Sequence, residues 1–252
     1  MSMAASGTWI ALFSGGKDSI WALHCAREAG RDVEALVTAT PRADSYLFHV
    51  PAVELTALQA EALGLPRYAF PVDEVEPDAV PDAGETGDRE LAALERELRA
   101  LVSAGELEPV GIITGAVAST FQRDRLAAMA DRLNLEICAP LWNVAPRTTL
   151  QAMIDAGYDI RIVAVSAGGL DASWLGRRLD AVTVGELTDL AEDFGIHLMG
   201  EGGEYETIVV DGPPFERAIS FDADVHWDGS RGWLEITDAR LAAEPEPPTR
   251  RS

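Results

Sequence analysis

Cysteine and histidine are scarce in this chain of 252 residues, and their scarcity excludes several kinds of site. Cys25 and Cys138 are far apart and form no C-x-x-C pair, so we expect no disulfide framework, iron–sulfur cluster or cysteine-rich zinc site. The four histidines show no metal-ligand spacing. No apolar run approaches the roughly 20 residues of a membrane span, and the N-terminus lacks a signal-peptide layout. We therefore expect a cytoplasmic protein with no membrane partner.

Positive charge is also scarce, and almost all of it is arginine. Lysine occurs once, at Lys17, against 19 arginines, and 42 acidic residues bring the net charge to −22. This balance argues against a nucleic-acid partner, because such binding depends on basic patches and released counterions. An acidic chain poor in lysine also indicates adaptation to molar salt, where the Debye length is about 3 Å and surface carboxylates repel one another little. In a halophilic host, the charge argues less strongly against nucleic acid.

Apolar strands and amphipathic helices alternate through the first half of the chain. Strand patterns lie at residues 8–13, 33–37, 68–70, 110–114 and 136–139, with helical patterns between them. This alternation predicts an α/β fold with a parallel sheet and right-handed crossovers. The acidic stretch 73–88, broken by proline and glycine, predicts a solvated loop, and residues 73–90 could form a lid.

The most informative turn is Ser14-Gly15-Gly16-Lys17-Asp18-Ser19, between the first strand and the first helix. A Gly-rich turn before a helix points backbone N–H groups and the positive end of the helix dipole at one spot, where phosphate usually binds. The serine hydroxyls add donors and Lys17 adds charge, while Asp18 could hold Mg²⁺ or orient Lys17. An ordinary turn could carry these residues too, but a cation is unfavourable at a helix N-terminus unless an anion joins it. We interpret the turn as a nucleotide phosphate site, although its spacing is not that of a Walker A motif.

Two further loops are expected beside this turn, because ligands of open parallel sheets bind at the carboxyl ends of the strands. The loop beginning at Thr38 and the loop from Gly115 to Arg123 would hold the base and ribose. Arg123 opens the following helix, so it could contact phosphate or substrate, or simply form a surface ion pair.

A domain boundary is expected at residues 140–146. It divides an ATP-binding domain at 1–139 from a smaller α+β domain at 140–240, followed by a disordered tail at 241–252. In the second domain a helix is expected to start at a capping box, Thr183–Glu186. Closing strands are expected at 215–221 and 233–237.

A second unusual stretch, Gly200–Thr207, carries Glu201, Glu204 and Glu206 between glycines and a tyrosine. Glycines let a backbone approach a ligand closely, so the stretch could form a binding site. Alternatively, it is a Gly-rich turn whose glutamates belong to the general acidic surface.

Taken together, the two stretches resemble the diphthine–ammonia ligase (diphthamide synthetase) family of the PP-loop ATP pyrophosphatases. Ser14–Ser19 matches the PP-loop signature of the superfamily, and Glu201–Thr207, extended by Asp211–Pro213, matches the narrower family. Shorter matches occur at Ser119–Arg123, Pro140–Trp142, Gly169–Asp171 and Trp174–Gly176. The resemblance implies a Rossmann-like adenine nucleotide alpha hydrolase domain, in the short form without additional C-terminal domains.

The resemblance implies ATP-dependent amidation of diphthine, a modified histidine of translation elongation factor 2, with ammonium as nitrogen donor. An acyl-adenylate would form and pyrophosphate and AMP would leave. Ser14, Gly15, Gly16, Lys17, Asp18 and Ser19 would hold ATP, with Mg²⁺ on Asp18. Catalysis would fall to Lys17, Asp18, Glu201, Glu204 and Glu206, and the substrate would meet Gly202, Gly203, Tyr205, Thr207, Trp142 and Trp174. The aromatic rings would offer cation–π faces to ammonium or trimethylammonium, although both tryptophans also suit a core role.

Three other functions remain open on the sequence. A tRNA-modifying PP-loop enzyme is one, but thiolation needs a persulfide-carrying cysteine, and neither cysteine lies in a suggestive setting. An amide ligase for another carboxylate is a second, since the loop could activate any carboxylate. A non-catalytic nucleotide sensor is the third, and it leaves the Lys17–Asp18 pair unexplained.

Overall fold

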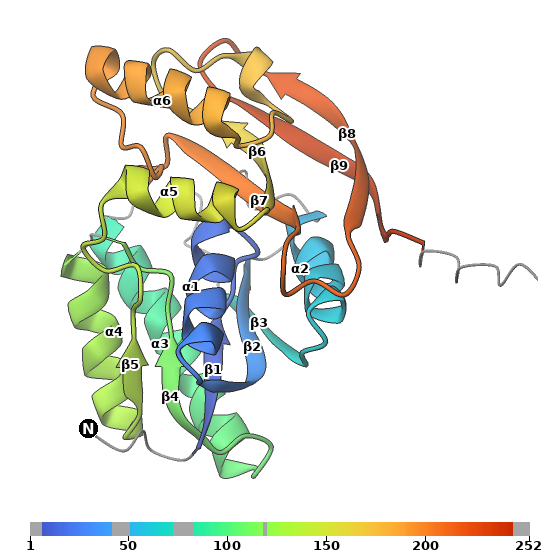
Figure 1. Ribbon diagram of the computed structural model, residues 1–252. Helices are drawn as coiled ribbons and strands as arrows, with labels where there is room; N and C mark the ends of the chain where they lie inside the picture. The colour runs from blue at the N-terminus through green and yellow to red at the C-terminus, as the bar shows by residue number, and fades with distance from the viewer. Residues whose placement is uncertain (1–6, 42–50, 73–82, 118–119, 244–252) are drawn as a thin grey trace, which may run out of the picture.

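The computed structural model describes residues 7–41, 51–72, 83–117 and 120–243. Two sheets account for the described strands (Figure 1). The first is a five-stranded parallel sheet in the order β3-β2-β1-β4-β5. Its strands are β1 (Thr8–Leu12), β2 (Asp32–Pro41), β3 (Arg67–Val72), β4 (Pro109–Ile113) and β5 (Glu136–Cys138). The predicted α/β class and the parallel sheet are therefore confirmed.

Alternating residues of β1 show why both faces of this sheet are covered. Ile10 packs into a cluster with Leu98 and Met129, whereas Ala11 packs into another with Leu23. The helices responsible are α3 (Ala83–Ser103) and α4 (Thr120–Leu133) on one face and α1 (Lys17–Glu28) on the other. The strand order reverses between β1 and β4, so the loop after β1 opens at the switch point where open parallel sheets bind ligands.

The second sheet is antiparallel, in the order β7-β6-β9-β8. Its strands are β6 (Asp159–Val165), β7 (Tyr205–Asp211), β8 (Ile219–Trp227) and β9 (Gly232–Leu241). In Figure 1 it lies above the carboxyl ends of the parallel strands, with α5 (Pro146–Asp155) and α6 (Ala181–Phe194) beside it. A short 3₁₀ turn, η1 (Ala172–Trp174), precedes α6. This arrangement places β7 directly over the loop after β1.

Helix α2 (Pro51–Ala62) connects the two sheets although it belongs to the first half of the chain. Its Leu55 and Leu58 pack with Ile208, Val210 and Ile219 of the antiparallel sheet. Figure 1 shows α2 below β8 and β9. The two halves are therefore packed against each other through shared apolar contacts as well as through the site.

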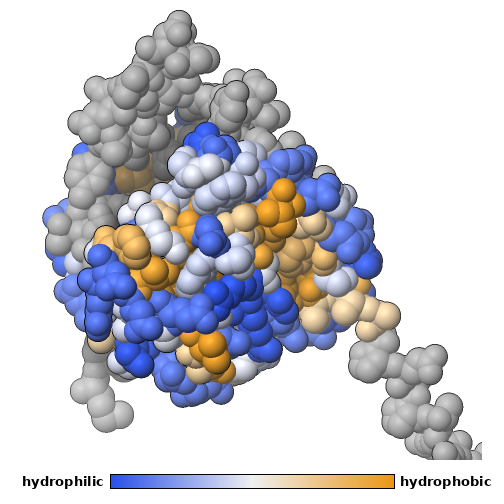
Figure 2. All heavy atoms as spheres, turned by 90° about the horizontal axis from the view of Figure 1, so that it is seen from above, coloured by the Kyte–Doolittle hydropathy of each residue, from blue (hydrophilic) through white to orange (hydrophobic). Residues whose placement is uncertain are grey.

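Seen from above, hydrophobic side chains of the described residues gather in several groups with hydrophilic ones between them (Figure 2). Exposed large apolar side chains of the described residues include Val182 and Phe194 of α6 and Val225 and Trp227 of β8. Among the described residues, no helix is long and apolar enough to cross a membrane.

Several sequence expectations need correction. The loop expected at 73–88 is wrong from Ala83 onward, where the backbone is helical despite Gly84 and Gly87. Residues 73–82, most of the suggested lid, lie outside the described residues. Helix α6 starts at Ala181 rather than at a Thr183 capping box, since the Asp180 carboxylate accepts the Thr183 N–H at 2.9 Å and caps the helix.

Two further corrections concern the C-terminal strands. The strand expected at 215–221 begins only at Ile219, because Glu216 donates its N–H to the Ala62 carbonyl of α2 at 2.7 Å and Phe215 closes a turn onto Gly212. Residues 241 and 242 were expected in a disordered tail, but Leu241 ends β9 and the Ala242 N–H donates to the Ala218 carbonyl. Residues 244–252 lie outside the described residues.

Candidate active site

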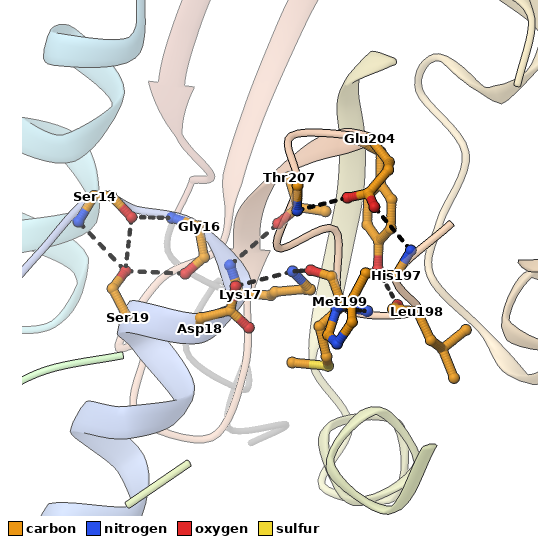
Figure 3. Close-up of polar contacts among 12 residues, drawn as sticks. Ser14, Gly16, Lys17, Asp18, Ser19, His197, Leu198, Met199, Glu204 and Thr207 are labelled. Carbon is orange, nitrogen blue, oxygen red and sulfur yellow. Dashed lines mark hydrogen bonds and ion pairs between the residues drawn. The ribbon is translucent and has the colours of Figure 1, made fainter. Parts of the chain in front are cut away.

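The turn between β1 and α1 is closed by hydrogen bonds among its own residues (Figure 3). The Ser19 hydroxyl donates to the Gly16 carbonyl at 3.0 Å and accepts from the Ser14 hydroxyl at 3.2 Å. The Gly16 N–H points at Ser14 Oγ, 3.4 Å away. Helix α1 begins at Lys17, three residues before the apolar pattern indicated, and Gly16 caps it without a side chain. The side-chain partner of the first N–H group of the helix comes instead from Thr207 of β7.

Lys17, the one lysine, joins this turn to the second unusual stretch. Its side chain is only 4% exposed, and its ammonium donates to the Met199 carbonyl at 2.6 Å and to Asp18 Oδ2 at 2.9 Å. Its backbone N–H donates to Thr207 Oγ1 at 3.2 Å (Figure 3). Burial alone would lower the pKa of Lys17, but the Asp18 carboxylate, with Tyr205 and Glu201, outweighs burial and raises it. The lysine therefore keeps its charge inside the site.

A cavity of about 410 Å³ opens beside the turn. Its polar lining comes from Ser14, Asp18, Ser19, Thr114, Arg125 and Glu201. Its apolar lining includes Leu12, Phe13, Val37, Ala39, Phe70, Leu91, Leu94 and Leu126. Polar groups of the Gly-rich turn together with apolar side chains of strands and helices suit a ligand that carries both phosphates and a planar base.

Glu204 holds the turn before β7 together. Its two carboxylate oxygens accept the backbone N–H groups of His197 and Gly202, each at 2.8 Å. Burial alone would raise the pKa of Glu204, but these hydrogen bonds outweigh burial and lower it. The turn is also fixed to the end of β6, since the Ser166 hydroxyl donates to the Gly203 carbonyl at 2.6 Å. Glu204 is thus a structural anchor, with both oxygens engaged by backbone.

Glu206 lies two residues further on and has a different environment. Burial raises the pKa of its carboxyl, and the positive charge of Lys17 offsets this only in part. No hydrogen bond from the described residues stabilises its charged form. A carboxyl of this kind takes up a proton more readily than an exposed glutamate, which is the property required of a general base near neutral pH.

Comparison with known proteins matches both halves of the chain to one family. The family model described as Diphthamide synthase N-terminal domain matches residues 7–137, and the model described as Diphthamide synthase C-terminal domain matches residues 145–242. The chain belongs to the diphthamide synthase family. The resemblance inferred from the two motifs is confirmed.

Curated relatives agree with this assignment. Proteins named diphthine–ammonia ligase from Bos taurus and Homo sapiens are 34% and 33% identical over 222 residues, which are 84% of this chain and 82% of each relative. The protein of that name from Schizosaccharomyces pombe is 34% identical over 90% of this chain but only 38% of its own length. A solved chain described as a predicted subunit of tRNA methyltransferase from Methanocaldococcus jannaschii aligns with a TM-score of 0.39 at 15% identity, over 81% of this chain and 96% of that one. That likeness is too low to support an argument.

Both motifs reach the cavity, the second through Glu201 alone among the described residues, and not every residue expected there lines it. Ser14, Asp18, Ser19, Gly115 and Glu201 do so. Thr38 is buried, and neither its side chain nor that of Arg123 is among the described lining. The Arg123 guanidinium pairs with Asp124 at 2.8 Å, and it lies 4.6 Å from the Trp142 ring centroid.

The aromatic residues proposed to meet the substrate cation are already in contact with cations of the protein. Arg177 stacks on Trp174 at 4.3 Å from the ring centroid, as Arg123 does on Trp142. The Tyr205 ring lies under the Lys17 ammonium at 5.1 Å, and the Tyr205 hydroxyl donates to the Leu198 carbonyl at 2.7 Å. Within the described residues, none of these rings lines the cavity. Each ring thus already has a cationic partner within the protein, and a role toward a substrate cation stays a prediction.

A magnesium ion fits one atom of the site. Asp18 Oδ2 is bonded to Lys17, but Asp18 Oδ1 is buried and has no hydrogen-bond partner among the described residues. A buried carboxylate oxygen without a partner is costly unless a ligand joins it, and oxygen is the ligand that Mg²⁺ prefers. Three or more metal-ligating side chains do not gather anywhere in the described part of the chain, so the remaining ligands would be phosphate oxygens and water.

Two residues at this site were not singled out from the sequence. Arg125 lines the cavity. The only sequence signal for this is its position next to Leu126, which belongs to the apolar face of α4 and also lines the cavity. Gln59 of α2 is 1% exposed and bonds to the turn itself. The sequence signal was a polar residue in register with Leu55 and Ala62 on the buried face of a helix.

Proposed function

We propose that this member of the diphthamide synthase family catalyses the ATP-dependent amidation of diphthine on translation elongation factor 2. Ammonium supplies the nitrogen, and pyrophosphate and AMP are released. The observation that carries the proposal is the direct bonding of Lys17 of the PP-loop to Thr207, in the Glu201–Thr207 stretch, and to Met199, two residues before that stretch. An ATP site and a carboxylate-rich site joined in this way are suited to forming an activated acyl group and amidating it in one place.

In the first step, an oxygen of the diphthine carboxylate attacks the α-phosphorus of ATP. The bond between the α-phosphorus and the oxygen bridging to the β-phosphate breaks, and pyrophosphate leaves with that electron pair. The backbone N–H groups of the turn and the hydroxyls of Ser14 and Ser19 stabilise the charge on the leaving group. The Lys17 ammonium is held by Met199 and Asp18, so it acts as a fixed positive charge beside the phosphates.

Asp18 Oδ1 would hold Mg²⁺ together with phosphate oxygens. The bound ion would neutralise charge on the leaving pyrophosphate.

In the second step, ammonia attacks the acyl carbon of the adenylate, and AMP leaves with the bridging oxygen. Ammonium must first lose a proton to become a nucleophile. Glu206 is the best candidate to accept that proton, because burial raises its pKa and no hydrogen bond from the described residues holds its charged form. Glu201 lines the cavity, and its negative charge suits it to hold ammonium or the trimethylammonium group of diphthine.

The glycines of the second stretch would let the modified histidine approach Glu201 and Glu206. Gly203 has φ +79°, and a Cβ built there would meet nothing within 4 Å. Gly202 lends its N–H to Glu204, which keeps the turn in shape. The substrate would thus approach backbone at Gly202 and Gly203, with Thr207 holding the turn from behind. Modification of a translation factor would take place in the cytoplasm.

The proposal is tested with purified protein, ATP and Mg²⁺, and elongation factor 2 that carries diphthine. AMP and pyrophosphate should form in equal amounts, and only when both the factor and ammonium are present. AMP formation that depends on a different carboxylate or on tRNA would overturn the proposed substrate. Nucleotide binding without AMP formation under all these conditions would overturn the proposed catalysis.

A further inference from the structure

Gln59 is a buried polar side chain that bonds to the PP-loop and is not part of the cavity lining. It lies on α2, and its Nε2 donates to the Gly15 carbonyl at 2.8 Å and to the Val209 carbonyl of β7 at 2.7 Å. The Val209 N–H donates to the same Gly15 carbonyl at 3.1 Å. Loop, helix and edge strand therefore meet in a closed ring of three hydrogen bonds.

The orientation of this amide follows from its partners. Both acceptors are carbonyl oxygens, so the NH₂ group must face them, and it uses both of its N–H donors. Gln59 Oε1 is buried without a hydrogen-bond partner among the described residues. It lies against Gly15, where an added Cβ would come within 2.2 Å of it and where φ is +79°. Position 15 thus requires glycine for two separate reasons.

The hydrogen bonds to the Gly15 carbonyl also determine the direction of the Gly16 N–H. In a trans peptide the C=O and the following N–H point in opposite directions. Because Gln59 and Val209 hold the Gly15 carbonyl on the β7 side, the Gly16 N–H is turned the other way, towards Ser14 Oγ at 3.4 Å. Ser14 lines the cavity. Without the Gln59 amide, the Gly15 carbonyl keeps only the Val209 N–H as donor, so the Gly15–Gly16 peptide is less restrained against rotation.

We propose that Gln59 is a positioning residue for the PP-loop. It fixes the Gly15–Gly16 peptide so that its N–H faces the terminal phosphates of ATP, and it locks that peptide to β7, the strand that carries Glu206 and Thr207. The inference rests on the proposed function only in taking the turn as the site of the β- and γ-phosphates.

The test is the binding of ATP and of AMP, measured by titration calorimetry with Mg²⁺ on the full-length protein. Gln59→Met keeps the length of the side chain and removes both N–H donors. We expect it to raise the Kd of ATP about tenfold, the effect of a buried hydrogen bond. The Kd of AMP, which lacks the terminal phosphates, should stay within about twofold of the wild type. Gln151→Met is the matched control, because Gln151 makes one exposed hydrogen bond, to Asp155 on α5, and both affinities should stay unchanged.

A second variant guards against misfolding. Gln59→Leu also removes both donors and places no charge beside the two carbonyl oxygens, so it should weaken ATP binding at least as much as Gln59→Met while sparing AMP binding. Circular dichroism and thermal unfolding establish that each variant is folded. Equal losses for ATP and AMP would show a merely structural role, and unchanged ATP binding in a folded variant would overturn the inference outright. Wild-type protein that binds ATP but fails to amidate diphthine would overturn the proposed function and leave this test valid.

Discussion

The two motif regions of this protein are built on different principles. In Ser14–Ser19 the backbone makes the site, because glycines expose N–H groups and two serine hydroxyls brace the turn. In Glu201–Thr207 the side chains make it, and similar residues have different roles. Glu204 has its carboxylate bound by backbone N–H groups and its pKa lowered, whereas burial raises the pKa of Glu206. The role of a motif built from backbone can thus be predicted from its sequence. The role of each glutamate in a run can be assigned only from the contacts that its side chain makes.

The largest effect is expected where the two regions join. Lys17→Ala should lower AMP formation about 10³-fold, because it removes the positive charge beside the phosphates and leaves the Met199 carbonyl without its donor. The measurement is AMP release with saturating ammonium and substrate protein. Arg99→Ala, which removes an exposed arginine paired with Glu95, is the control and should have wild-type activity. Unchanged turnover in a folded Lys17→Ala protein would remove the phosphate site from the account.

The second-largest effect is expected at Glu206 and distinguishes its role from that of Glu204. Glu206→Gln should lower the ammonium-dependent kcat about 10²-fold with the Kd of ATP unchanged, because it removes the proton acceptor. Since burial raises the pKa of Glu206, the acid limb of the wild-type pH–rate profile should lie at higher pH than for an exposed glutamate. The rate falls as pH falls through that raised pKa, since only the ionised carboxylate accepts a proton. If the pH–rate profile of Glu206→Gln shows the same acid limb as the wild type, another group is the base.

Glu204 should affect stability instead. Glu204→Gln should lose about 1–3 kcal/mol of unfolding free energy at neutral pH, because an amide cannot accept both the His197 and Gly202 N–H groups. The folded-state pKa is below the ordinary 4.5, so the unfolded state binds its proton first as pH falls. The stabilisation is therefore present above about pH 4.5 and is lost as pH falls through the folded pKa.

Urea unfolding at a series of pH values checks this prediction. The wild type should lose stability in the acid range, and Glu204→Gln should lose less of it there. Parallel curves for the two proteins would mean that Glu204 is not held as the geometry indicates.

The smallest predicted effect compares two arginines of α4. Arg125 lines the cavity, whereas Arg123 stacks on Trp142 and pairs with Asp124. Arg125→Ala should raise the Kd of ATP about fivefold, the value of one charge-assisted contact at a partly exposed site, and Arg123→Ala should leave it unchanged. The reverse result would restore Arg123 to the nucleotide site.

The parallel sheet and the PP-loop could be predicted because their signals are local. Apolar runs alternate with amphipathic helices, and the glycines of the turn follow a strand directly. The start of α3 could not, since its glycines at 84 and 87 argue against the helix that the fold nevertheless forms there. The cap of α6 was also misplaced, because Asp180 and Thr183 are both good capping residues and the sequence does not say which one is used.

The contacts between the two halves were beyond the sequence altogether. Gln59 bonds to Gly15 and to Val209, which lie 44 and 150 residues away, and Lys17 bonds to the backbone of Met199, 182 residues away. A carbonyl acceptor has no sequence signature, since every residue carries one. For the same reason the sequence did not indicate that the rings of Trp142, Trp174 and Tyr205 contact arginine and lysine side chains of the protein itself.

The joined PP-loop and Glu201–Thr207 site is proposed to amidate diphthine. Mass spectrometry of elongation factor 2 from a strain that lacks this gene tests the claim most directly. We expect the factor to accumulate diphthine, with the free carboxylate, and the wild-type gene to restore diphthamide while the Lys17→Ala gene does not. Normal diphthamide in the strain that lacks the gene would contradict the account.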